Sequence, residues 1–538
     1  MPARRVLLHR RAGKELLRLC AGQESQTAAQ LATHFERGRD FAQAVKHLLE
    51  TGDNACRLYD NMAALHHYTH ALKLTEKLPE LERGRRRLLA YQKRGAAQMA
   101  LGRLREAEDD LRGALDQARS LGDALAECLA LNALANSLIP SHKLTDLGAA
   151  ATEARRIAER IGSQPLRAEA VTNQGLALMA SGSIRESAKL LEEAIPAARA
   201  CDHMPALIPA LTFRGLLHNF RSDYQQAEAL EAEASALASK VRDGFYLPLS
   251  LFYLGIIRTN LGRFSEASAT LTEGLEMARR NGNRVVLARI PNAIGWAYRE
   301  LRDIPKAIDY DRMSAEMARE MKLAEAESHA LINLAHDYAA AGEAGLAIAA
   351  LRRAEPLLER DPWYHWRFFD IRLQAAAGDV WLAQNELDKA HEHGTRLLAS
   401  ARRHEAPKYM SLARNLLAET AMAAGENERA ATEARNSIAE LGPGPAPLAA
   451  WKSWGTLGRA LLRLGDKESA RQAFAEGAAI LKTILANIGD QNLCATFLNA
   501  PDVRAVFMGT TQARGGAVTG LASELPSRAR TERRSRSG

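Results

Sequence analysis

Small and apolar residues recur along the chain in a register that repeats about every 40 residues. The clearest unit begins at Gly95 and continues with small residues at offsets of +7, +12 and +19, which are Gly102, Ala107 and Ala114. We expect the first small residue and the one at +12 to lie where two helices cross, because a large side chain there would push the helices apart. The glycine at +7 opens the turn between the helices. The residue at +16 is Leu111, on the apolar side of the second helix.

Nine further units keep this register, in steps of 40 residues with a single step of 43. The +12 position tests the alignment independently, because the units were aligned on their first position. Alanine occupies +12 in eight of the ten units, although only about one residue in five of the whole chain is alanine. So much alanine and only 5% aromatic residues favour closely packed helices over a β-rich fold. The first positions are Gly95, Ala135, Gly175, Gly215, Gly255, Gly295, Ala335, Gly378, Ala418 and Gly458.

These offsets resemble those of tetratricopeptide repeats, whose minimal unit of 34 residues is a pair of helices. The longer pitch makes each helix nearly one turn longer. The resemblance implies an all-α fold, an α-solenoid of about ten to twelve tetratricopeptide-like helix pairs in a right-handed superhelix. We expect N-terminal helices over 1–39, the solenoid over 40–488, a closing helix over 489–508 and a disordered basic tail over 509–538.

A narrower resemblance lies at the two ends of the chain. It is carried by LLHRRAGKELLRL and AAQLATHFERGRDFAQAVKHLLETGDNA near the N-terminus and by CATFLNAPDVRAVF near the C-terminus. These segments are similar to the repeat arm of bacterial signal-transduction ATPases, a group that includes maltose-regulator-like transcription activators. In that group the arm senses and binds partners, while an upstream motor hydrolyses ATP.

The chain departs from that group in lacking the motor. No G-x-x-x-x-G-K-[ST] loop, whose backbone would cradle phosphates, occurs in the sequence. The resemblance therefore implies a role in bacterial signalling or transcriptional regulation without ATPase or cyclase activity in this chain. The alternative is that the chain is the C-terminal arm of a split or truncated ATPase- or cyclase-type regulator. The nucleotide-binding motor then lies outside the chain, and an ATPase regulator is the partner.

The net charge of +8 comes from the ends of the chain. Residues 1–20 carry +5 and residues 509–538 carry +4, which leaves −1 on the body between them. Nucleic-acid binding needs a basic face on the folded part, so it is not favoured. The longest apolar run without charge, Gly244 to Ile257, has fourteen residues and is too short to span a bilayer. We therefore expect no membrane segment. Because five scattered cysteines form no CxxC pair, we also expect a reducing, cytoplasmic location.

Asparagines recur in the first helix of several units. Asn132, Asn292 and Asn415 lie three residues before the aligned small residue, and Asn173 and Asn333 lie two before it. In tetratricopeptide stacks the first helix lines the concave groove, where an amide both donates to and accepts from an extended peptide backbone. The pattern predicts a protein or peptide partner in this groove. The alternative is an exposed, solubilising helix face, and Asn173 and Asn333 fit equally well against the neighbouring helix.

An aromatic cluster stands out in this aromatic-poor chain. It includes Trp363 and Trp366, which we predict as hydrophobic anchors for a partner, because tryptophan dominates binding hot spots. The alternative is that the cluster fills a wider helix crossing, which would also explain the 43-residue step.

Candidate chemistry is otherwise sparse. His66 and His70 lie one helical turn apart, but no second ligand cluster follows, so a solvated helix face is favoured over a metal site. No catalytic arrangement of Ser, His, Cys or paired carboxylates stands out. We therefore predict a non-catalytic protein- or peptide-binding scaffold or sensor without a cofactor.

Overall fold

The computed structural model describes residues 2–22, 24–140, 143–359, 364–442 and 446–512, without the side chains at 2, 358–359, 364–369 and 511–512. The predicted all-α solenoid is confirmed, because the described residues form helices and no strand. The helices pair in sequence from α1–α2 to α24–α25, with α15 and α16 together serving as the first helix of one pair. The helices are α1 (Pro2–Leu19), α2 (Glu24–Arg37), α3 (Phe41–Arg57), α4 (Asn61–Thr75), α5 (Glu80–Ala100), α6 (Leu104–Ser120), α7 (Ala124–Leu138), α8 (Leu144–Arg160), α9 (Gln164–Ser181), α10 (Ile184–Ala200), α11 (Met204–Phe220), α12 (Tyr224–Val241), α13 (Tyr246–Asn260), α14 (Phe264–Asn281), α15 (Arg284–Leu287), α16 (Ile290–Glu300), α17 (Ile304–Met321), α18 (Ala324–Ala340), α19 (Ala344–Glu359), α20 (Tyr364–Ala383), α21 (Leu387–Arg403), α22 (Pro407–Ala423), α23 (Asn427–Glu440), α24 (Pro447–Arg463), α25 (Lys467–Leu485), α26 (Gln491–Asn499) and α27 (Pro501–Gln512).

The aligned small residues lie where the two helices of a pair cross. A Cβ atom on Gly255 would lie 2.5 Å from Leu271, which occupies the +16 position of the same unit. The same contact recurs between Gly458 and Phe474, at 2.7 Å. Because interiors are close-packed, such approaches leave no room for a larger first residue. The eight +12 alanines are all 0% exposed, namely Ala107, Ala227, Ala267, Ala307, Ala347, Ala390, Ala430 and Ala470.

The +7 residue opens the turn inside a pair by taking a left-handed backbone conformation. Gly182 and Gly465 have φ values of 85° and 84° there. Ser222, Arg302 and Asn385 occupy the same position in other units and also have positive φ, between 58° and 65°. A left-handed residue is therefore what these turns require, and a non-glycine residue adopts it at a cost of about 1–2 kcal/mol.

Two segments differ from the expected course. The first helix of the Gly295 unit is divided into α15 and α16, because Pro291 has no N–H to donate to the carbonyl of Leu287. The segment expected to close the stack as one helix forms two, α26 and α27, which meet at Ala500. Helix α27 continues to Gln512, past the expected boundary at residue 508. Residues 513–538 of the predicted tail lie outside the described residues.

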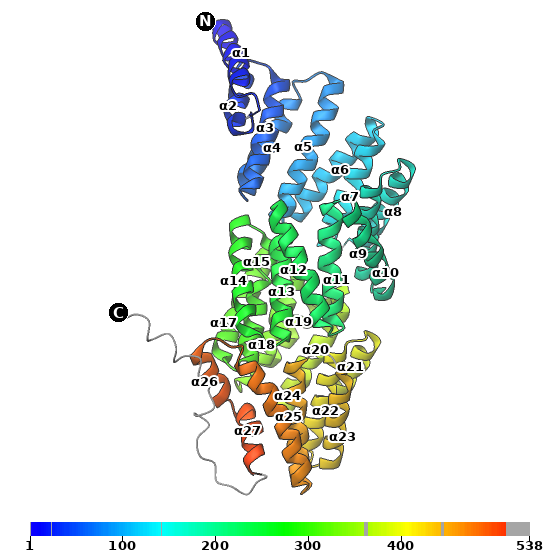
Figure 1. Cartoon of the computed structure of the whole chain (residues 1–538), viewed down its shortest axis with the longest axis vertical. Coiled ribbons are helices and arrows are strands. Elements are labelled where there is room, and N and C mark those ends of the chain that lie inside the picture. The colour runs from blue at the N-terminus through cyan, green and yellow to red at the C-terminus, as the bar shows by residue number, and fades with distance from the viewer. Residues whose placement is uncertain (1, 23, 141–142, 360–363, 443–445, 513–538) are drawn as a thin grey trace, which may run out of the picture.

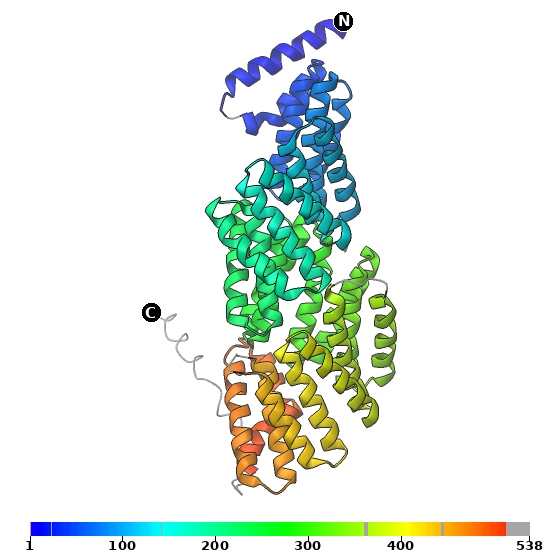
Figure 2. The ribbon, with the colours of Figure 1, turned by 90° about the vertical axis from the view of Figure 1, so that its right-hand side faces the viewer.

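The superhelix winds back on itself, so that segments 148 to 220 residues apart touch. The pairs stack along the long axis of the molecule, with α1 and α2 at one end and α24 and α25 at the other (Figures 1 and 2). Phe264 and Leu301 belong to the same apolar cluster as residues of α22 to α27. We call the contact between these distant turns of the superhelix the seam. Across the seam, the backbone N–H of Ser265 donates to the carbonyl of Asn487 at 2.9 Å. The winding therefore encloses the inner side of the central repeats.

Among the described residues, no helix has both the length and the apolar character that crossing a membrane would require.

Candidate ligand-binding site

A cavity of about 640 Å³ lies among the first helices of seven successive pairs, α11, α13, α16, α18, α20, α22 and α24. Lys452 on α24 and Asp502 on α27 join its wall because of the seam. Lys452 Nζ lies 2.8 Å from Glu300 Oε2 on α16. The volume falls within the range of about 300–1,000 Å³ that is typical of ligand pockets. The cavity is therefore the strongest candidate for a binding site in the described part of the chain.

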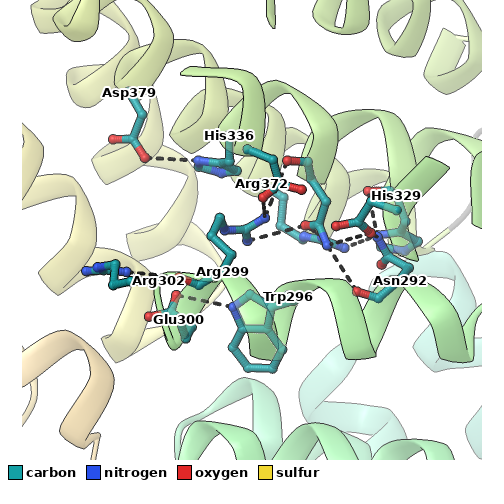
Figure 3. A network of polar contacts seen from close by, with 12 residues as sticks. Asn292, Trp296, Arg299, Glu300, Arg302, His329, His336, Arg372 and Asp379 are labelled. Atoms are coloured by element: carbon teal, nitrogen blue, oxygen red, sulfur yellow. Dashed lines mark hydrogen bonds and ion pairs between the residues drawn. The ribbon is translucent and has the colours of Figure 1, made fainter. Parts of the chain in front are cut away.

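A buried polar network forms one side of the cavity (Figure 3). Asn292 and Asn333 both donate through Nδ2 to Asp311 Oδ1, at 2.6 and 3.2 Å. Asn333 Nδ2 also lies 3.2 Å from the backbone carbonyl oxygen of Asn292. Arg299 Nη1 lies 3.1 Å from Asp337 Oδ1. The network ties α16, α17 and α18 together and thereby fixes the wall.

Asp311 occupies the +16 position of its unit, where Leu111, Leu191 and Leu271 stand in others. A Cβ on Gly295 would lie 2.5 Å from Asp311 Oδ2, so the glycine makes room for the carboxyl group. Burial, together with the charge of Asp337, raises the pKa of Asp311 well above its usual range. Asp311 is therefore harder to ionise than an ordinary aspartate.

His329 on α18 connects two charged groups of the wall. Its Nε2 lies 3.4 Å from Glu325 Oε1, and its Nδ1 accepts a hydrogen bond from Arg372. Burial and the nearby Arg372 lower the pKa of His329 to about 4. The imidazole is therefore neutral at physiological pH, and the bond from Arg372 places its proton on Nε2. Glu325 also pairs with Arg289, in the break between α15 and α16.

Three of the five predicted asparagines line the cavity, namely Asn292, Asn333 and Asn415. Asn132 and Asn173 lie elsewhere, in the joint between two repeats, with 0% and 2% exposure. Asn173 Nδ2 donates to the backbone carbonyl of Asn132 at 3.2 Å, the same bond that Asn333 makes to Asn292. The two pairs therefore share a structural role between repeats. Binding of a ligand by Asn132 and Asn173 stays a prediction.

Asn415 differs from the other asparagines because its buried Oδ1 has no hydrogen-bond partner among the described residues. An unsatisfied buried acceptor in a cavity wall is available to a donor on a ligand. Trp363 lies outside the described residues, and so does the side chain of Trp366, whose backbone belongs to α20. Their anchoring role stays a prediction.

Aromatic side chains form the apolar part of the wall. Phe220 and Phe252 line the cavity from α11 and α13, and Trp296 lines it from α16. Trp296 Nε1 donates to Glu300 Oε1 at 3.3 Å, which fixes the indole ring. Apolar walls with a few fixed polar groups are typical of ligand pockets.

Sequence reasoning missed most of the charged wall. A signal was present for Asp311, because a carboxyl group at an otherwise apolar +16 position predicts a special environment. Arg299, Arg372 and Lys408 carried no such signal, since charged residues are common on the first helices. Within the described part of the chain, no three metal-ligating side chains gather.

Residues 452–480 match the tetratricopeptide repeat family model. The chain is therefore a tetratricopeptide repeat-containing protein, a type of scaffold consistent with protein–protein interaction. No curated protein matched the sequence. The narrower resemblance to signal-transduction ATPases stays a prediction.

Solved structures of similar fold include a Rap protein complexed with the competence and sporulation factor. It has a TM-score of 0.53 and 15% identity, over 67% of this chain and 99% of that one. The Cut9–Hcn1 hetero-tetramer of the APC/C has a TM-score of 0.44 and 17% identity, over 94% and 91% of the two chains. A tetratricopeptide repeat protein from Parabacteroides merdae has a TM-score of 0.33 and 16% identity, over 54% and 99%. At these identities the Rap likeness bears on the fold alone.

Proposed function

We propose that the protein is a non-catalytic scaffold or sensor that binds a peptide or an extended protein segment in the cavity, in bacterial signalling or transcriptional regulation. The observation that carries the proposal is the cavity itself, whose wall is built by seven successive helix pairs. Such a wall suits an extended ligand, because each repeat offers contacts at its own level. A Rap protein of similar fold was solved with the competence and sporulation factor, and that complex motivates the choice of a peptide as the ligand to test.

The wall offers an extended ligand both polar and apolar contacts. Asn415 Oδ1 can accept from a backbone N–H, while Asn292 and Asn333 are already held by Asp311. Phe220 and Phe252 can pack against apolar side chains of the ligand. The ligand must also fit between turns of the superhelix that touch each other. Its binding is therefore expected to change the spacing of the turns, since repeats contact mainly their neighbours.

The test fills the cavity and leaves the rest of the fold intact. Ala340, at the end of α18, is exposed and lines the cavity, so Ala340→Trp places an indole ring inside it. Ala475, exposed on α25 and outside the cavity wall, gives the matched control Ala475→Trp. Peptides selected from a random-sequence display library against the full-length protein are then titrated against all three proteins.

We expect the selected peptides to bind the wild type and Ala475→Trp equally and to lose about tenfold or more in affinity for Ala340→Trp, a cost of about 1.4 kcal/mol. Circular dichroism checks that both variants keep the helical content of the wild type. Equal affinity for all three proteins would place the peptide site outside the cavity and contradict the proposal.

A further inference from the structure

Some basic side chains of the cavity wall have no carboxylate partner. Five carboxylates line the described wall. Four of them have a lysine or arginine partner, while Asp379 contacts His336, whose pKa burial lowers. Six lysine and arginine side chains line it, and two of them, Arg372 and Lys408, have no carboxylate within ion-pair distance among the described residues. The paired groups are Glu300 with Lys452, Glu325 with Arg289, Asp379 with His336, Glu419 with Arg459, Asp502 with Arg302, and Arg299 with Asp337 outside the lining.

Arg372, on α20, is held in place by neutral groups. Its Nη2 donates to Asn333 Oδ1 at 2.7 Å, and its Nη1 donates to the neutral His329. No acceptor among the described residues contacts its Nε. Burial lowers the pKa of this guanidinium, which nevertheless remains charged in proteins. Arg372 therefore presents a fixed positive charge and free N–H donors to the cavity.

Lys408, on α22, is also held by neutral groups. Its Nζ donates to Asn260 Oδ1 at 2.8 Å and lies 4.8 Å from the centre of the Trp296 ring. The ammonium has three N–H donors, so two remain available. Burial, with smaller contributions from Lys452, Arg372 and Arg299, lowers the pKa of Lys408 to about 7, although the charge of Glu300 acts in the opposite direction. Lys408 therefore presents a buried amine with further N–H donors to the same cavity that Arg372 lines.

Two buried cations in one cavity wall, neither with a carboxylate at ion-pair distance, are costly, and a bound anion would offset that cost. Arginine offers a planar fork to carboxylate and phosphate oxygens, and lysine adds a point charge. The apolar wall around Phe252 and Trp296 would receive an uncharged part of the same ligand.

We propose that the ligand of this cavity presents an oxyanion, a carboxylate or a phosphate, to Arg372 and Lys408. The proposal rests on the proposed function only in taking the cavity as the binding site. It adds the chemical class that the site recognises, and it holds equally for an acidic group of a peptide and for a small amphipathic acid.

The test follows the reactivity of the Lys408 amine in the full-length protein. Trace labelling with acetic anhydride and mass spectrometry measures its rate relative to Lys452, which lines the same cavity but is paired with Glu300. The probes are inorganic phosphate, hexanoate and the neutral analogue hexanamide, at constant ionic strength. A bound oxyanion stabilises the protonated amine and slows its labelling.

At a pH below the amine pKa of about 7, we expect saturating hexanoate or phosphate to slow labelling of Lys408 by about tenfold, the effect of one unit in the pKa of the amine. Protection by hexanoate alone identifies a carboxylate site, and protection by phosphate alone identifies a phosphate site. Equal protection by hexanamide would show that the cavity selects apolar groups without regard to charge and would overturn the proposal. An unchanged rate with every probe would overturn it as well.

Variants of Arg372 separate a binding role from a structural one. Arg372→Met is expected to weaken oxyanion protection by about tenfold or more, and Arg372→Lys to restore part of it. Arg352 is exposed on α19 and lies outside the cavity wall, so Arg352→Met is the control. In this control, the oxyanion should protect Lys408 from labelling as well as it does in the wild type. If the oxyanion protected Lys408 equally in Arg372→Met and Arg352→Met, Arg372 would have no role in binding the oxyanion.

The two proposals fail in different ways. If selected peptides lose affinity for Ala340→Trp but no oxyanion protects Lys408, the cavity binds peptides without an anion site. If an oxyanion protects Lys408 but no peptide binds in the cavity, the ligand is a small acid and the peptide proposal falls.

Discussion

Glu231 offers a sharp test of how the repeat register determines burial. It occupies the +16 position of the Gly215 unit, where Leu191 stands in the preceding one. Its side chain is 0% exposed, and neither carboxyl oxygen has a hydrogen-bond partner among the described residues. Leucine fits over glycine at the equivalent contact between Gly175 and Leu191. We therefore predict that Glu231→Leu stabilises the pair α11–α12.

The magnitude follows from the linkage between protonation and folding. Burial raises the pKa of Glu231 well above its usual range, so the folded state keeps a proton that the unfolded chain releases. The stability of the wild type is then highest below the ordinary carboxyl pKa and falls as the pH rises toward the raised value. The slope is about 1.4 kcal/mol for each pH unit between the ordinary pKa and the raised one, so the wild type loses stability relative to Glu231→Leu as the pH rises through that interval.

Hydrogen exchange followed by mass spectrometry measures this difference locally, which suits a repeat protein whose pairs open separately. Comparison of the proteins at the same pH cancels the intrinsic pH dependence of exchange. We expect the ratio of the protection of α11 and α12 in Glu231→Leu to that in the wild type to grow by about tenfold for each pH unit between the ordinary pKa and the raised one. Glu231→Gln is the control, because it removes the titrating group but keeps a buried polar side chain.

A constant ratio of protection between the wild type and Glu231→Leu from about pH 5 to about pH 7 would refute the reasoning. It would mean that the carboxyl group ionises in the folded state at its ordinary pKa, in contact with water or a counter-charge.

Three further predictions concern packing and the cavity charges. Gly255→Ala places a Cβ 2.5 Å from a leucine, and we expect urea unfolding to show a loss of about 1–3 kcal/mol in the free energy of unfolding. The control Gly148→Ala has open space around its Cβ and should not destabilise the protein. Equal urea midpoints for the two variants would contradict the close helix crossing at Gly255. Arg299→Met leaves Asp337 buried without its partner and costs about 3–5 kcal/mol, seen as a lower Tm, and an unchanged Tm would show that the pair contributes nothing. Lys408→Met removes a cation whose pKa burial lowers to about 7, so the variant is more stable than the wild type near neutral pH. That gain shrinks by about 1.4 kcal/mol per unit as the pH rises toward about 10, and a gain that is independent of pH would exclude a buried titrating amine.

The fold was predictable because its decisive contacts are local. The crossing of Gly255 with Leu271 joins residues sixteen positions apart, so one unit of sequence contains both partners. The same holds for the +12 alanines and the left-handed +7 turns, and the prediction of helix pairs along the chain is confirmed. The break at Pro291 was not predictable in the same way, because Pro196 and Pro209 lie inside the continuous helices α10 and α11.

The candidate site was only partly predictable. The asparagine pattern indicated the first helices as the inner wall, and Asn292, Asn333 and Asn415 do line the cavity. The same pattern includes Asn132 and Asn173, which are buried between repeats. Helical period fixes the face on which a side chain lies but not whether that face meets the next helix or the cavity.

The sequence by itself determined the helix pairs, their order and the buried small residues, because each depends on packing within one unit or between neighbours. Only the tertiary structure decided which distant units meet. Each repeat adds a small rotation, and the sum of these rotations brings Lys452 beside Glu300 and Lys408 beside Asn260. The cavity, with its two cations that lack a carboxylate at ion-pair distance, arises from that closure, and no single unit of sequence contains it.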